Sequence, residues 1–168
     1  TFDTLFEEHK NTRIIVATFA SNVDRVQQII NSAYKFGRKV CVEGRSMVSI
    51  IETARNLECI SIPDDTLIEI EQMKDYPDEK QVIITTGSQG ESMAALSRMA
   101  GGMHRKITIG AGDTVIFSSN PIPGNEKSVT KVINELIRKG ADVIFQDAHV
   151  SGHACQEEIK LIYTLVHP

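Results

Sequence analysis

The sequence predicts an α/β fold: a mostly parallel, open sheet with helices on both faces. Short runs rich in β-branched residues recur at regular intervals along the 168 residues. Amphipathic segments with helical spacing stand between most of these runs, an alternation typical of parallel strands joined by helices. The composition, 41% apolar and 24% charged, is that of an ordinary globular protein, and the length suits a single domain, residues 1–168.

Seven apolar runs are predicted to be strands. Near-continuous apolar runs of this length suit strands that are covered on both faces, as in a parallel sheet. In chain order they are residues 13–19, 39–44, 59–62, 81–87, 106–109, 113–119 and 141–145.

Four segments are predicted to be helices, because apolar side chains recur in them at helical spacing. The first is 23–36, which ends at Gly37, and the second is capped by Ser46. The third is 126–139, which is capped by Asn125 and ends at Gly140, and the fourth is 155–166. The acidic stretch 63–80, with two prolines, is predicted to be a connector that contains a short helix.

The composition narrows the classes of function. A net charge of −4 provides no global basic field, so any polyanion site has to be local. Three well-separated cysteines exclude a disulfide framework and a CxxC zinc motif, and Cys41 and Cys59 are predicted to be buried thiols. No apolar run is long enough to span a membrane and no leader opens the chain, so a cytoplasmic location without membrane contact is expected.

Three loops that follow predicted strands share one composition. They are "TFASN" (18–22), "TTGSQGES" (85–92) and "SSNPIPGNE" (118–126), rich in Gly, Ser, Thr and Asn. Parallel strands usually bind ligands at their carboxyl ends, where glycines admit a close phosphate and free N–H groups attract anions. The loops are candidates for phosphate binding, although capped turns without a ligand would have the same composition.

The stretch "HVSGHA" (149–154) places two histidines four residues apart near the end of the chain. His149 and His153 could form half of a metal site, donate to phosphate oxygens or shuttle protons, or only stabilise a polar turn. No HExxH or HxHxDH motif accompanies them, and no third ligand follows from spacing. A metal site within the chain is therefore not expected, and donor chemistry is the favoured interpretation.

Six stretches together resemble a known family along nearly the whole chain. They are "ATFASNVDRVQQII", "GRSM", "IPDDTLI", "ITTGSQGESMAALSRMA", "HRKITIGAGDTVIFSSNPIPGNE" and "HVSGHACQEEIKLI". The chain resembles the β-CASP domain of bacterial ribonuclease J. The resemblance implies a three-layer domain of Rossmann or flavodoxin-like architecture, excised from a larger metallo-β-lactamase/β-CASP enzyme. Such an enzyme is a zinc-dependent endoribonuclease and 5′-to-3′ exoribonuclease in RNA processing and decay.

The resemblance also implies roles for individual residues. His153 falls on a family motif whose histidine reaches the catalytic centre. Further residues fall on RNA and phosphate-binding positions: His149, Ser151 and Gly152 on one loop, Ser88, Gln89 and Gly90 on the facing loop, and Thr18, Ser21 and Asn22 along the RNA path. The two zinc ions of such an enzyme would be held by the metallo-β-lactamase domain, and no metal or other cofactor is expected in these 168 residues.

The partners implied are RNA, preferably a 5′-monophosphorylated single strand, and the metallo-β-lactamase domain of the same chain, in an enzyme expected to be a homo-oligomer. The fragment alone is expected to be inactive. Two alternatives come from other classes: a stand-alone module that binds a phosphorylated small molecule or nucleotide, and an independent hydrolase with His149 or His153 as general base.

Overall fold

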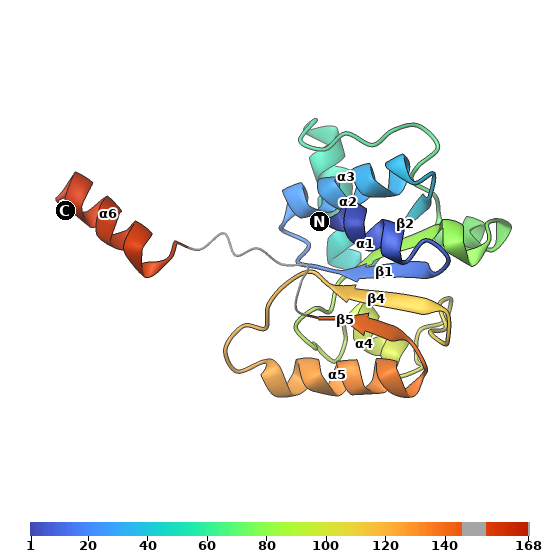
Figure 1. Ribbon diagram of the computed structural model, residues 1–168. Helices are drawn as coiled ribbons and strands as arrows, with labels where there is room; N and C mark the ends of the chain where they lie inside the picture. Colours follow the sequence, from blue (N-terminus) through green and yellow to red (C-terminus); the bar gives the residue numbers. More distant parts are fainter. Residues whose placement is uncertain (146–153, 168) are drawn as a thin grey trace.

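The computed structural model describes residues 1–145 and 154–167 (Figure 1). Within them, five parallel strands form one sheet in the order β2-β3-β1-β4-β5. Their bounds are β1 Arg13–Ala17, β2 Lys39–Glu43, β3 Gln81–Thr85, β4 Asp113–Phe117 and β5 Asp142–Ile144. The predicted α/β architecture with a parallel sheet is confirmed.

Helices cover both faces of this sheet, as Figure 1 shows. On one face lie α1 (Phe2–Glu8), α2 (Val23–Lys35) and α3 (Arg45–Asn56), and on the other lie α4 (Ala95–Ala100) and α5 (Glu126–Arg138). The connector 63–80 contains two short 3₁₀ helices, η1 (Ile70–Asp75) and η2 (Asp78–Lys80). The final helix of the chain is α6 (Gln156–Val166).

The strands separate two apolar cores because alternate side chains point to opposite faces. Ile14 and Val16 of β1 pack toward α1, α2 and α3, whereas Ile15 and Ala17 pack toward α4 and α5. All four side chains are fully buried. α1 was not anticipated from the sequence, although its buried Phe2 and Phe6 are spaced as on one helical face.

Two predicted strands, 59–62 and 106–109, are wrong, because their backbone hydrogen bonds run to side chains or to the end of α3 and not to a neighbouring strand. In 59–62 the side chain of Gln27 accepts a hydrogen bond from Ser61 N–H at 2.7 Å and donates one to Ser61 C=O at 2.8 Å. The segment has a strand-like apolar alternation but lies outside the sheet.

The segment 106–109 is held in a similar way. The N–H of Ile107 donates to Nδ1 of His104 at 3.1 Å, and the C=O of Thr108 accepts from the guanidinium of Arg13 at 2.7 Å. The imidazole of His104 is only 6% exposed.

Two further local predictions are corrected. Ser46 is not a helix cap: α3 already begins at Arg45, and Gly44, with φ of +106°, precedes it as the N-cap. Glycine adopts such a backbone conformation at little cost. Cys41 is buried as predicted, but Cys59 is exposed.

α6 exposes apolar side chains over most of its surface. None of its residues is buried, and six large apolar side chains are each more than half exposed: Ile159, Leu161, Ile162, Tyr163, Leu165 and Val166. A helix that is apolar over much of its circumference is normally covered on more than one side. In the part of the chain that the structure describes, no helix is both long and apolar enough to cross a membrane.

Ile83 is expected to be essential for stability, because it is fully buried on β3 between β2 and β1. Ile83→Ala should lower the free energy of unfolding by about 2–5 kcal/mol through lost burial and the cavity left behind. Urea unfolding measures this loss as a lower midpoint. The control Tyr34→Ala, at a side chain that is 59% exposed, should change the free energy by less than about 0.5 kcal/mol. Equal shifts for the two variants would contradict the assignment of the core.

Candidate functional site

The carboxyl ends of the three inner strands lie level with one another. Ala17, the last residue of β1, pairs with Thr85 of β3 on one side and with Phe117 of β4 on the other. The ladder continues one step further, since Thr18 N–H donates to Thr85 C=O at 3.1 Å and Ser118 N–H donates to Ala17 C=O at 2.8 Å. Consequently, the loops 18–22, 86–92 and 118–125 begin at one edge of the sheet.

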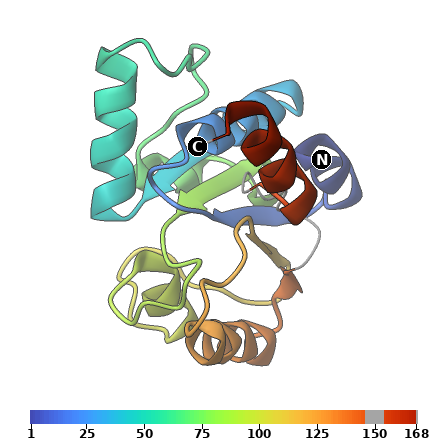
Figure 2. The ribbon, with the colours of Figure 1, turned by 90° about the vertical axis from the view of Figure 1, so that its left-hand side faces the viewer.

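This edge is also where the connections change direction. The loop after β1 leads to α2 on one face, whereas the loops after β3 and β4 lead to α4 and α5 on the other. Figure 2, seen from the left-hand side of Figure 1, shows these two helical layers above and below the sheet. Open α/β sheets bind ligands in the crevice at such a switch point. The topology therefore places the candidate site around the end of β1.

Thr18 carries an unusual hydroxyl at this point. The residue is 1% exposed, and its Oγ1 is buried without a hydrogen-bond partner among the described residues. Burying a hydroxyl without a partner costs about 1–3 kcal/mol, so such groups are uncommon and call for an explanation. A ligand oxygen that accepts from Thr18 would remove this cost.

Gln89 links two of the loops through its side-chain amide. Its Oε1 accepts from Ile122 N–H at 2.7 Å and from Asn125 Nδ2 at 3.3 Å. Its Nε2 donates to Asn120 C=O at 3.0 Å and to Ser119 Oγ at 3.3 Å. The residue is 3% exposed, so its amide holds the loop after β3 against the loop after β4.

Gly90 allows the same two loops to approach closely. Its φ is +73°, and a Cβ added there would lie 2.4 Å from the carbonyl carbon of Ser128 and 2.6 Å from the nitrogen of Val129, in the first turns of α5. Any side chain would therefore push this loop away from the start of α5. Ser88, directly before Gln89, is 2% exposed.

The predicted residues of the first loop differ in their environment. Asn22 caps α2, because its Oδ1 accepts from Arg25 N–H at 3.1 Å. Ser21 is exposed. The sequence did not single out Ser119, which is 1% exposed at the same edge, although it lies within a loop whose composition had been noted.

The remaining predicted residues, His149, Ser151, Gly152 and His153, lie outside the described residues. Within residues 1–145 and 154–167, no group of three His, Cys, Asp or Glu side chains gathers closely enough to hold a metal ion. The described residues therefore do not fit a zinc site.

Comparison with known proteins identifies a matching family profile and several relatives. The family profile described as ribonuclease J, beta-CASP domain, matches residues 11–136. The chain is 49% identical to ribonuclease J of Helicobacter pylori over 99% of its own length and 24% of that protein. It is 45% identical to ribonuclease J2 of Bacillus subtilis, with 95% and 29% covered, and 48% identical to ribonuclease J of Thermus thermophilus, with 93% and 28% covered. The chain thus spans less than a third of the length of these relatives.

Gly90→Ala tests the close approach of the two loops. A left-handed backbone costs a residue with a side chain about 1–2 kcal/mol, and the overlap with α5 should add about 1–3 kcal/mol. The matched control is Gly124→Ala, where φ is +99° but no atom lies within 4 Å of an added Cβ. Thermal or urea unfolding of both variants should show the larger loss for Gly90→Ala. Equal losses would mean that the loop moves away from α5 without cost.

Proposed function

The chain belongs to the β-CASP domain family of ribonuclease J, and on that premise we propose that it is the RNA-binding domain of a zinc-dependent ribonuclease. The enzyme would combine endonucleolytic with 5′-to-3′ exonucleolytic cleavage, prefer a 5′-monophosphorylated strand, and act in the cytoplasm on RNA in processing and decay. RNA phosphates would lie along the carboxyl edge of β1, β3 and β4.

The buried hydroxyl of Thr18 is the observation that carries this proposal. It lies at the switch point of the sheet and lacks a partner among the described residues, while the neighbouring loops are held together by Gln89. A phosphate oxygen accepts hydrogen bonds strongly, and pre-ordered donors bind it without an ordering cost. Thr18 Oγ1 and the loop N–H groups would supply such donors, with Ser21 contributing from the exposed part of the first loop.

The residues 149–153 would complete the site. His149, Ser151 and Gly152 would bind the phosphate opposite the loop that carries Ser88, and His153 would reach the reacting phosphodiester. A histidine can exchange protons near neutral pH, so His153 could protonate a leaving or non-bridging oxygen. The zinc pair would supply a metal-activated water and would be held by residues outside these 168.

The proposed arrangement also needs a second domain, and α6 supports one. Its six exposed apolar side chains require a cover, and the relatives are more than three times as long as the chain. We infer that a metallo-β-lactamase domain of the same protein packs against α6, so that RNA lies between the two domains. Homo-oligomer formation by the complete enzyme would involve further segments.

Thr18→Val separates a ligand-binding role from a structural one. Valine keeps the shape of threonine and removes a hydroxyl that has no partner to lose, so the free energy of unfolding should stay constant or rise. The affinity for a fluorescent, 5′-monophosphorylated RNA oligonucleotide should fall about tenfold, because loss of one hydrogen bond to a charged group lowers an affinity by about this factor. Fluorescence anisotropy measures this affinity. Repeated over a range of salt concentrations, the affinity should fall as the salt concentration rises.

Two controls accompany this measurement. Ser97→Ala removes another buried, unpartnered hydroxyl on α4 and should leave RNA binding unchanged. A 5′-hydroxyl oligonucleotide tests the preference for the monophosphate. A Thr18→Val variant that is destabilised but binds RNA normally would assign the hydroxyl to the fold and remove the main support for the proposal.

His153→Ala tests the proposed catalytic role in the complete protein. RNA cleavage should slow by about 10²–10⁴-fold, the usual contribution of a proton-transferring group. The zinc content, measured by elemental analysis, should not change, because His153 is not proposed as a ligand. His167→Ala, at an exposed residue beyond α6, is the matched control. Cleavage by His153→Ala at the normal rate would contradict the assignment.

A further inference from the structure

A groove lies beside the outer edge of β2, two strands away from β1, and Gly44 at its rim adjoins Thr86 of the loop after β3. Its volume is about 660 Å³, and its walls come from the end of β2, the first turns of α3 and the segment 67–71. β2 is an edge strand of the sheet, so one side of its backbone faces this groove rather than another strand.

The outer edge of β2 is only partly covered. The segment around Leu67 pairs with Val40: Val40 N–H donates to Thr66 C=O at 2.7 Å, and Ile68 N–H donates to Val40 C=O at 2.9 Å. Because hydrogen-bonding direction alternates along a parallel strand, Val42 has the same orientation as Val40. The described residues offer no backbone partner to this side of Val42, which lines the groove. An edge of this kind can pair with an added strand.

The floor of the groove can accept apolar side chains. Val48 and Ile51 of α3 line it on one side, and Leu67, Ile68 and Ile70 line it on the other. Val48 is 38% exposed, which is high for an apolar side chain in a concave site. An inserted strand would present alternate side chains to these two walls.

The groove is acidic. Glu43, Glu52, Glu69 and Glu71 line it, against only Arg45 and Lys106. Its surroundings have the same sign, since residues 43–80 contain ten Asp and Glu but four Lys and Arg. The thiol of Cys41 lies at the base of the groove. Burial raises the pKa of this thiol to about 12, and the charges of Glu43, Glu69 and Glu71 act in the same direction. RNA would be repelled here, whereas a basic segment would be attracted.

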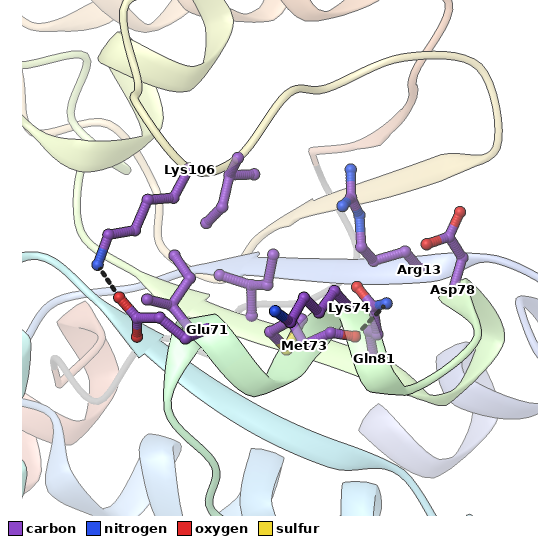
Figure 3. Close-up of a pocket in the computed structure, with 10 residues that line it drawn as sticks. Arg13, Glu71, Met73, Lys74, Asp78, Gln81 and Lys106 are labelled. Atoms are coloured by element: carbon purple, nitrogen blue, oxygen red, sulfur yellow. Dashed lines mark hydrogen bonds and ion pairs between the residues drawn. The ribbon is translucent and has the colours of Figure 1, made fainter.

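An ion pair lines part of the groove. Lys106 and Glu71, both more than half exposed, form a contact that also borders a neighbouring cavity of about 460 Å³ (Figure 3). That cavity lies at the amino ends of the strands, near Arg13 and Gln81, so it is not part of the candidate RNA site. Glu52 and Glu69 are exposed carboxylates that also line the groove.

We propose that this groove binds an extended protein segment with alternating basic and apolar residues, which adds a strand to β2 at Val42. The backbone of the segment pairs with Val42, its apolar side chains enter the space lined by Val48 and Leu67, and its basic side chains face Glu52 and Glu69. The inference is independent of the proposed RNA function, because it concerns another edge of the sheet and another class of partner.

The probe is a fluorescein-labelled hexapeptide of alternating lysine and valine with blocked termini. Titration with the chain should give saturable binding, and the Val42 amide proton should exchange more slowly with solvent when the peptide is bound. The double variant Glu52→Lys/Glu69→Gln should weaken binding about tenfold, because both side chains are exposed and the acidity of the groove falls, while glutamine at 69 keeps a side-chain oxygen for the capping box of η1. Binding of the RNA oligonucleotide by this variant should not weaken.

Three controls make the result specific. Glu8→Lys changes an exposed carboxylate on α1, outside the groove, and should leave peptide affinity unchanged. A glutamate-valine hexapeptide should bind at least tenfold more weakly, and so should a lysine-valine hexapeptide in which every backbone nitrogen is methylated, because it has no backbone N–H to donate to the β2 edge. Equal binding of all three peptides, unchanged binding by the double variant, or self-association of the chain through this groove would overturn the proposal.

Discussion

The parallel ladder around β1 is the constraint on which the rest of the structure depends. Its register makes Ala17 level with Thr85 and Phe117, so the chain leaves three strands at one height. A shift by one residue would exchange the two faces of a strand and place Ile15 in the core that Ile14 occupies. Both cores resist such a shift, because these side chains are fully buried. The packing that stabilises the domain therefore also aligns the loops of the candidate site.

Alignment alone would leave three separate loops, and Gln89 is the residue that joins two of them. The family resemblance implies an RNA or phosphate-binding position for Gln89, yet both atoms of its amide are already bonded to residues 119–125. Gly90 supports the same contact by allowing the loop to reach α5. Gln89 and Gly90 thus order the loops, and the hydroxyl of Thr18 has no partner among the described residues. A site of this kind gains affinity from groups held in place before the ligand arrives.

The elements predicted correctly were those whose backbone bonds lie within a helix or within the ladder. The runs at 59–62 and 106–109 have the apolar character of strands, but Gln27, His104 and Arg13 satisfy their backbones instead. A pattern of apolar residues predicts which side chains are buried, but it does not predict the hydrogen-bond partner of each backbone N–H group. The sequence alone could therefore not exclude these two strands. The loops of the site were found from composition, whereas the linking role of Gln89 depends on contacts between residues more than thirty positions apart.

Charge is distributed unevenly over this fold, and a net charge of −4 conceals that distribution. All of the excess acidity lies between Glu43, at the end of β2, and Lys80: this segment has ten acidic and four basic residues, whereas the rest of the chain has twelve acidic and fourteen basic residues. β3 separates β2 from β1, so the acidic groove begins about 10 Å from the end of β1 at normal strand spacing. Since the Debye length in physiological salt is about 8 Å, exposed carboxylates there are largely screened from a phosphate beside Thr18. One small sheet would then present the proposed polyanion site at the carboxyl end of β1 and the proposed site for basic segments at the edge of β2.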